Sequence, residues 1–258
     1  MAEAGCPARV MRCETVLRAR TGRVLLVLDR IQDPHNEAAA HRTAEALGVQ
    51  QVWSVSPVLE SRKKRPAKRD AKAVAKGADA WLSLERFETP AACVGALRSG
   101  GWEIWCAADG DGATALSLPR PAGVADARKV AVVIGREADG CAADFLNAAT
   151  RRVFVEMRGF TTSLNLSVAT ALILQRVFDW FPAFVGDLDE GERDDLREAW
   201  RSKIAKNDTA KRKLEAWLDA PETIPDAAAR SASAAEASVS CGSWAPRRFQ
   251  DEEARARL

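Results

Sequence analysis

Histidine is scarce in this chain of 258 residues, and its two occurrences are not placed to bind a metal. His35 and His41 lack partners at the spacing that zinc ligands adopt. Structural and catalytic zinc sites draw most of their ligands from histidine and cysteine. The sequence therefore predicts no metal cofactor.

Cysteine is also uncommon, with six residues and no CxxC spacing. Cys93, Cys106 and Cys141 lie in apolar segments, and we interpret them as small buried residues. This pattern favours a reducing compartment over a disulfide framework.

Long apolar runs are missing too. No run reaches the length of a membrane span without charges, so no membrane association is expected. The first residues lack the apolar core of a signal peptide. Four arginines before residue 21 leave an organellar transit peptide open, although acidic residues interrupt them. We expect a cytoplasmic location, with a nuclear or organellar one as the alternative.

The net charge of +2 predicts no partner, but the basic residues are unevenly distributed. Residues 61–76 carry lysine or arginine at eight positions. One interpretation is a solvated surface segment, and the other is a nucleic-acid contact or a nuclear-import signal. The residues of such a contact would be Arg62, Lys63, Lys64, Arg65, Lys68 and Arg69.

Hydrophobic residues make up 47% of the chain, which is enough for a sizeable core. Short aliphatic runs, each followed by a helical pattern, predict an α/β domain with a mainly parallel sheet flanked by helices. The predicted strands are 24–28, 51–55, 81–84, 102–106, 129–134 and 152–155. The predicted helices are 8–19, 36–47, 90–98, 142–148, 163–181, 189–206 and 209–219. Residues 109–128 show little regular pattern.

Four segments follow from this pattern. Residues 1–22 form an N-terminal helical segment, and 23–182 form the α/β domain. Residues 183–220 form a C-terminal helical extension. Residues 221–258 are rich in Ala, Ser, Arg and Glu with few large apolar residues, so we expect a mostly disordered tail.

Three polar loops follow predicted strands, at residues 29–36, 135–140 and 156–165. In parallel sheets, ligands bind beyond the carboxyl ends of the strands, so these loops are expected to converge. Asn36 is predicted to cap its helix, with Arg42 in the second turn able to reach back toward the loop. Ser163 has two interpretations, a helix cap or part of a binding loop.

The loop after the strand 129–134 has the sequence GREADG. It lacks both the GK[ST] of a phosphate-binding loop and G-x-G-x-x-G, which disfavours a standard nucleotide site. Gly135 is expected to let a ligand approach the backbone closely. The candidate polar residues of the three loops are Asn36, Arg42, Glu137, Ser163 and Asn165.

Three stretches resemble motifs of one family. DPHNEAAAHRTAEALGV resembles the first motif of the SpoU family of RNA ribose 2′-O-methyltransferases, the TrmH branch of the SPOUT superfamily. VVIGREADGCAADFLNAA resembles the second motif, and VFVEMRGFTTSLNLSVATALIL the third. All three occur in the family's order across about residues 23–180. The segment VAKGADAWL also resembles the tRNA D-loop guanosine enzymes of this family.

This resemblance implies a C-terminal deep trefoil knot and bound S-adenosylmethionine. By motif position, the cofactor contacts are Gly135, Val155 and Leu164. The resemblance also implies a homodimer in which helices near the knot pack across a two-fold axis. The apolar stripe of the helix 163–181 and its following residues would supply that surface. Its aromatic residues are Phe178, Trp180, Phe181 and Phe184.

The resemblance assigns Arg42 to the ribose 2′-oxygen. Arginine hardly ever loses its proton in proteins, so we expect Arg42 to position and polarise that oxygen rather than act as a base. Asn36, Glu137, Ser163 and Asn165 would orient Arg42, the ribose and the cofactor loop. Glu156 departs from the family, which usually has proline there, and the sequence assigns it no role.

The expected activity is therefore RNA 2′-O-methylation, with a tRNA guanosine as the first expectation for the target. An rRNA target is the nearest alternative. A knotted RNA-binding or assembly protein without catalysis is the alternative of a different class. A Rossmann-type reductase would need a glycine-rich first loop, and residues 33–36 do not form one.

Overall fold

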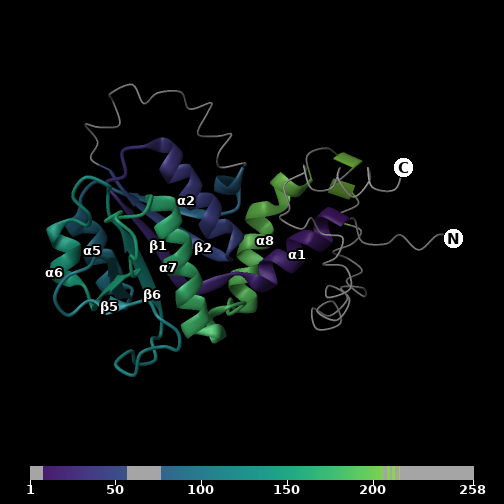
Figure 1. Ribbon diagram of the computed structural model, residues 1–258. Coiled ribbons are helices and arrows are strands. Elements are labelled where there is room, and N and C mark those ends of the chain that lie inside the picture. Colours follow the sequence, from purple (N-terminus) through teal and green to yellow (C-terminus); the bar gives the residue numbers. More distant parts are fainter. Residues whose placement is uncertain (1–7, 57–76, 206–207, 210, 213–214, 216–258) are drawn as a thin grey trace, which may run out of the picture. The chain divides into compact units, whose positions relative to one another are not determined.

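The computed structural model describes residues 8–56 and 77–205, with 208, 209, 211, 212 and 215 (Figure 1). Residues 16–203 form one compact unit that contains the whole sheet. The start of α1 (Ala8–Ala19) and the described residues from 204 onward belong to a second unit. The predicted RNA-binding residues 62–69, the predicted helix 209–219 in large part, and the tail 221–258 lie outside the described residues.

The core of the larger unit is a seven-stranded sheet with the order β3-β2-β1-β6-β4-β7-β5. Its described strand pairs are all parallel, which confirms the predicted parallel sheet. The strands are β1 (Thr21–Asp29), β2 (Val49–Val55), β3 (Ser83–Phe87), β4 (Glu103–Ala107), β5 (Thr114–Ala115), β6 (Val130–Ile134) and β7 (Arg151–Phe154).

The two central strands are the most apolar ones, because both of their faces are covered. Leu25 of β1 pairs with Ala131 of β6, and every residue of β6 is buried. Burying one Leu or Val side chain contributes about 1.5–3 kcal/mol, so the buried side chains of β1 and β6 contribute strongly to the stability of the unit. The edge strand β3 is exposed along most of its length. The two-residue strand β5 lies in the stretch for which no regular structure was predicted.

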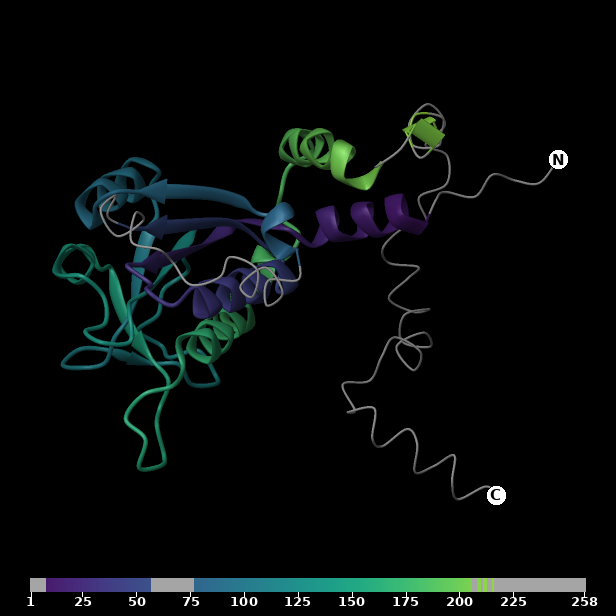
Figure 2. The same ribbon diagram turned by 90° about the horizontal axis from the view of Figure 1, so that it is seen from above.

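Helices cover the two faces of the sheet. One hydrophobic cluster joins the sheet to α2 (Pro34–Ala46) and α7 (Leu166–Trp180), which also contact each other. A second cluster joins it to α5 (Pro90–Ser99) and α6 (Ala143–Ala148). Figure 2 shows these helix pairs on opposite sides of the strands. Short 3₁₀ turns at Ala78–Ala80 (η1) and Pro182–Phe184 (η2) and the helix α8 (Glu190–Ile204) complete the elements.

The aromatic residues at the end of α7 are part of the core, which corrects the expectation that they form a dimer surface. Phe178, Trp180, Phe181 and Phe184 are 2–7% exposed. Trp105 of β4 makes edge contacts with Trp180 and Phe181. The apolar stripe at the end of α7 was predicted correctly from the sequence. Its aromatic side chains cover this chain's own sheet instead of facing a second subunit.

Two structural absences apply to the part of the chain that the structure describes. None of its helices is long and apolar enough to cross a membrane. In the same residues, no group of His, Cys, Asp and Glu side chains is arranged to hold a metal ion.

Candidate functional site

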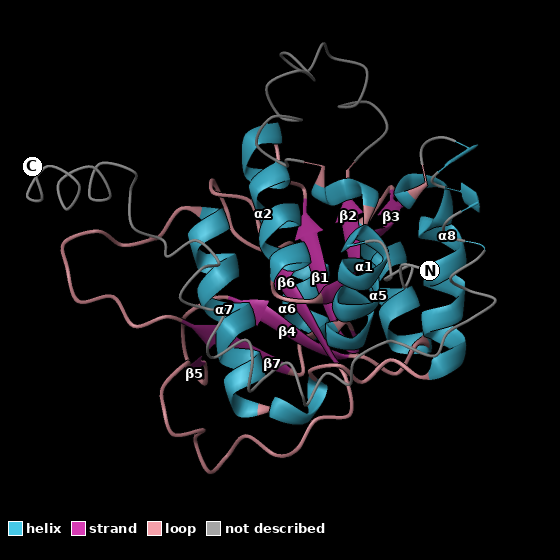
Figure 3. Ribbon diagram, turned by 90° about the vertical axis from the view of Figure 1, so that its right-hand side faces the viewer, coloured by secondary structure: helices cyan, strands magenta, loops and turns pink. Residues whose placement is uncertain are grey.

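Three loops meet beyond the carboxyl ends of the strands. They follow β1, β6 and β7, as the sequence predicted. The loop between β7 and α7 extends away from the sheet (Figure 3), and residues 156–163 are exposed along its whole length. Parallel strands direct all three loops to one edge, where a ligand can touch segments that are far apart in the sequence.

Hydrogen bonds connect one polar residue from each motif. Asn36 Nδ2 donates to Glu137 Oε1 at 2.8 Å. Asn165 Nδ2 donates to Asn36 Oδ1 at 3.1 Å and to Glu137 Oε1 at 3.4 Å. Three of the five predicted catalytic residues therefore form one cluster, which we call the Asn–Glu–Asn cluster.

The helix caps differ from the prediction and explain how the cluster forms. Asp33 caps α2 by accepting from His35 N at 2.8 Å, and Pro34 occupies the first turn. Asp33 before a proline is a strong helix start, so the cap moves three residues upstream. The predicted cap at Asn36 is therefore wrong. Asn36 lies inside the helix, and its side chain is free to meet Glu137.

Asn165 serves two functions at once. Its Oδ1 accepts from Ser167 N at 2.9 Å and from Ser167 Oγ at 2.6 Å, which caps α7. A carboxylate only accepts hydrogen bonds, so the amide Nδ2 must face Glu137. The helix cap thus fixes which end of the amide enters the cluster. Ser163 lies before the helix, which rules out the alternative that it caps α7.

Arg42 is not part of the cluster. Its side chain is exposed and forms no hydrogen bond or ion pair with any described residue. Six residues along a helix correspond to a rotation of roughly 240°, so Arg42 and Asn36 point in different directions. The expected reach of Arg42 back to the loop, and its orientation by the cluster, are therefore absent from the described part of the chain.

A cavity of about 630 Å³ adjoins the cluster. All three predicted cofactor contacts, Gly135, Val155 and Leu164, line it, together with Glu137 and Ser163. The other walls come from residues 107–109, from the loop 157–163 and from the start of α7. Ile134, Leu166 and Ile173 supply apolar surface. The volume lies within the range of about 300–1,000 Å³ that is typical of small-molecule sites.

Gly135 is required for a reason other than the expected one. A Cβ at this position would lie 2.1 Å from Gly140 C and 2.2 Å from Cys141 N. The protein's own backbone therefore occupies the space that we expected a ligand to need. The glycine lets the loop 135–141 fold back on the end of β6.

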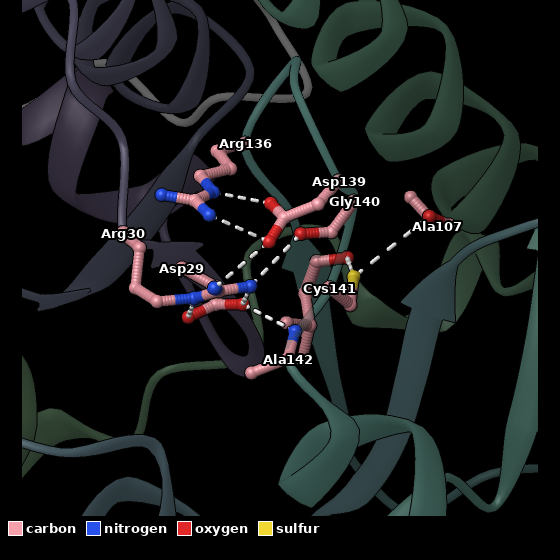
Figure 4. A network of polar contacts seen from close by, with 9 residues as sticks. Asp29, Arg30, Ala107, Arg136, Asp139, Gly140, Cys141 and Ala142 are labelled. Atoms are coloured by element: carbon pink, nitrogen blue, oxygen red, sulfur yellow. Dashed lines mark hydrogen bonds and ion pairs between the residues drawn. The ribbon is translucent and has the colours of Figure 1, made fainter.

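A charged network at the end of β1 holds the same loop (Figure 4), and no motif or periodicity in the sequence indicated it. Asp29 is fully buried and accepts from Ala142 N at 2.6 Å. Arg30 binds Asp29, Asp139 and the carbonyl of Gly140. Hydrogen bonding to Asp29 raises the pKa of Arg30, and hydrogen bonding to Arg136 lowers the pKa of Asp139 to about 2.

The arginines of the helix α8 are paired with carboxylates of the same helix. Arg193 pairs with Glu190 at 3.1 Å, and Arg201 pairs with Glu198 at 3.2 Å. Arg197 also pairs with acidic residues of the same helix. These arginines are expected to attract RNA phosphates weakly, because neighbouring carboxylates already compensate their charge.

Comparison with known proteins places the chain among RNA-modifying enzymes. The sequence pattern of the SpoU rRNA Methylase family matches residues 23–175. A tRNA (guanosine(18)-2′-O)-methyltransferase of Borreliella burgdorferi is 30% identical over 201 residues, which cover 76% of this chain and 85% of that protein.

Two solved structures share the fold. The TrmH/SpoU tRNA modifying enzyme of A. aeolicus superposes with a TM-score of 0.63 at 22% identity, over 76% of this chain and 96% of that one. An AdoMet-bound rRNA methyltransferase from Sinorhizobium meliloti has a TM-score of 0.52 at 20% identity, over 64% of this chain and 60% of that one.

Proposed function

The chain belongs to the SpoU rRNA methylase family, and we propose that it transfers a methyl group from S-adenosylmethionine to a ribose 2′-oxygen of RNA. The observation that carries this proposal is the Asn–Glu–Asn cluster at the wall of the cavity. Three motifs supply one side chain each: Asn36 lies 101 residues before Glu137, and Asn165 lies 28 residues after it. A purely structural role would not require the cluster to adjoin a cavity of ligand size.

The cavity suits S-adenosylmethionine by its chemistry. Its apolar walls can hold an adenine ring, and the loop backbones offer N–H and C=O groups for polar contacts. We propose that Gly135, Val155 and Leu164 hold the cofactor through such groups. When bound, S-adenosylmethionine supplies a methyl group on a positively charged sulfur.

Glu137 is proposed to receive the proton of the ribose hydroxyl. Its Oε1 accepts from Asn36 and Asn165, whereas no described residue binds Oε2. Oε2 can therefore accept a hydrogen bond from the 2′-hydroxyl, and it would take up that proton as the oxygen gains the methyl group and the bond from the methyl group to sulfur breaks to leave an uncharged thioether. Asn36 and Asn165 hold the carboxylate of Glu137 in place. The carboxylate is therefore already oriented when the RNA binds, which lowers the entropic part of the barrier.

Arg42 is proposed to act on the substrate directly. A guanidinium remains protonated, so it can polarise the 2′-oxygen or bind a phosphate but cannot serve as an ordinary base. Its exposure and lack of partners among the described residues leave it available to RNA. Ser163, on the cavity wall, is proposed to hydrogen-bond the ribose or the cofactor.

The target is proposed to be a tRNA guanosine. The Borreliella relative acts on guanosine 18 of tRNA by its name, and the match covers 85% of its length. An rRNA target is the second candidate, because the family description names rRNA. The basic residues Arg62 to Arg69 are proposed to bind RNA phosphates.

The assembly is proposed to be a homodimer, in which the C-terminal part of the domain 23–182 threads a deep trefoil knot and residues 183–220 form a helical extension. Family membership supports the knot. For the dimer, the surface available on α7 is its exposed face at Val168 and Leu172, since the aromatic end is buried. We further propose a cytoplasmic location, in line with the cysteine pattern.

Methyl transfer to purified RNA tests the activity and its target. Labelled S-adenosylmethionine is supplied with unmodified total tRNA and, separately, with rRNA, and the product is mapped for 2′-O-methylated nucleotides. Label in one tRNA guanosine supports the leading proposal, and label in rRNA alone changes the substrate. Cofactor binding without transfer to either RNA contradicts both targets. Absence of cofactor binding favours the non-catalytic alternative.

A further inference from the structure

The loop that carries Glu137 is held by the end of a different strand. Gly140 N donates to Arg136 O at 2.9 Å, which closes residues 136–140 into a tight turn. Glu137 lies within this turn, and its side chain is exposed toward the cluster. Its position therefore depends on what fixes the turn as a whole.

Arg30 contacts this turn at two points. Its Nη1 donates to Asp139 Oδ2 at 3.2 Å, and its Nη2 donates to Gly140 O at 3.1 Å. Its Nε donates to Asp29 Oδ1 at 3.0 Å, so the buried carboxylate holds the guanidinium in place. One planar group with several donors in fixed directions can make all of these contacts together.

Asp29 extends the same attachment to the far side of the turn. Its Oδ2 accepts from Ala142 N, directly before α6. Arg136 binds Asp139 from within the turn, with Nη2 to Oδ2 at 2.7 Å. Asp29, the last residue of β1, and Arg30, which follows it, thus hold the turn at Asp139 and Gly140 and the chain after it at Ala142.

The backbone of Arg30 indicates that these contacts have a cost. Its φ of 56° is in the left-handed region, and Arg30 is the only non-glycine residue with positive φ in the described chain. Glycine would adopt this conformation without a steric penalty. Residues in such conformations persist where the surrounding contacts require them, and they concentrate at functional sites.

We propose that Arg30 is a positioning residue for methyl transfer, which holds the 136–140 turn so that Glu137 meets Asn36 and Asn165. This inference rests on the proposed function. Arg30 itself is four-fifths buried and engaged by two carboxylates, so it does not serve as an RNA contact. It acts through the turn.

The test compares Arg30→Gly and Arg30→Lys with the wild type. Glycine keeps the backbone conformation and removes all the side-chain contacts, whereas lysine keeps the charge without the fixed fork. Arg98→Gln is the matched control, since it removes an exposed arginine of α5. Methyl-transfer kinetics give kcat and KM for RNA, and hydrogen exchange follows the amides of residues 136–142.

For Arg30→Gly we expect kcat to fall by about 10-fold to 100-fold, because a displacement of ~1 Å can cost 10²-fold. KM for RNA stays within about 2-fold of the wild-type value, because Arg30 makes no contact that would bind the RNA in the ground state. The amides of 136–142 exchange faster, Arg30→Lys recovers part of kcat, and the control matches the wild type. Combined with Glu137→Gln, the loss is less than additive, because both changes remove the same interaction.

The opposite pattern overturns the proposal. A raised KM with unchanged kcat makes Arg30 an RNA contact, and unchanged exchange shows that it does not hold the turn. If Arg30→Gly fails to fold, Asp139→Asn takes its place, because it removes one residue through which Arg30 holds the turn. The same changes in kcat, KM and hydrogen exchange are then expected. If the wild type methylates no RNA, the proposed function fails, while the exchange comparison still decides whether Arg30 fixes the turn.

Discussion

At the residue scale, the candidate site depends on side chains that do more than one job. Asn165 is both the cap of α7 and a donor to Glu137. Asn36 both donates to Glu137 and accepts from Asn165. Such sharing fixes the orientation of each group, because a change in one hydrogen bond disturbs the others. The motif pattern predicted these residue types, and the structure adds which atom faces which.

Substitutions of Asn165 should separate capping from activity. Serine caps a helix about as well as asparagine, whereas alanine costs about 1 kcal/mol. We expect Asn165→Ser to keep the thermal unfolding midpoint and lose methyl transfer, because the donor to Glu137 is gone. Asn165→Ala should lower the thermal unfolding midpoint and also lose methyl transfer. Calorimetry and the transfer assay on both variants measure this, and an active Asn165→Ser would show that the cluster is not needed.

The buried thiols should be chemically inert. Burial raises the pKa of Cys93 from an ordinary 9.0 to about 12, and hydrogen bonding with Cys106 together with burial raises the pKa of Cys141. Only the thiolate reacts readily, so peptides that contain Cys93 and Cys141 should remain unlabelled by iodoacetamide at pH 8 in the native protein. Mass spectrometry of digests measures this, and labelling before unfolding would contradict it.

The same shift sets a dependence of stability on pH. The unfolded thiol ionises near pH 9 and the folded Cys93 near 12, so the contribution of Cys93 is fully present below pH 9 and lost between these values.

At the element scale, the sequence predicted most helices and strands to within a few residues, and the errors have physical causes. The predicted cap of α2 lay three residues too late, because Asp33 followed by Pro34 is a stronger helix start than Asn36. The strand Thr114–Ala115 was missed, because two residues carry no periodic signal. The side chains at the end of α7 were apolar as expected, but periodicity does not reveal which surface they cover.

The helix α5 contains a position where the native residue is not optimal. Gly95 lies in its interior and is exposed, and a Cβ added there would meet no atom within 4 Å. Alanine has the higher helix propensity, so Gly95→Ala should stabilise the protein by about 1 kcal/mol without changing activity. Urea denaturation measures this free energy. The same substitution at Gly135 serves as a contrast, since a Cβ there meets backbone at 2.1 Å.

At the scale of the whole molecule, the sequence predicted the parallel sheet and the convergence of three loops. The loops met because parallel strands place their carboxyl ends at one edge. The strand order was not predictable, since burial patterns indicate that a strand exists but not which strands are its neighbours. The contact of Arg30 with Asp139 joins residues 109 positions apart, and it had no local signal for the same reason.

The binding of RNA should depend on salt through the basic segment rather than through α8. Changing Arg62, Lys63, Lys64 and Arg65 to glutamine should lower the slope of log K against log salt concentration by about 0.7–0.9 for each phosphate that is no longer neutralised. Arg193→Gln is the control, because its guanidinium already pairs with Glu190. Fluorescence anisotropy with labelled RNA measures both. If the wild type and the variants show equal slopes of log K against log salt concentration, residues 62–65 do not contact RNA phosphates.

The most direct test of the proposed site is single-turnover methyl transfer by Glu137→Gln, with Glu88→Gln as the control. Glu88 is exposed after the edge strand β3, so the control changes the same charge elsewhere. A glutamine cannot accept from Asn36 and Asn165 and also present an acceptor that takes up a proton. We predict a rate about 10²-fold or more below that of the wild type, with the control unchanged. A wild-type rate for Glu137→Gln would contradict the account, because methyl transfer would then not depend on the cluster.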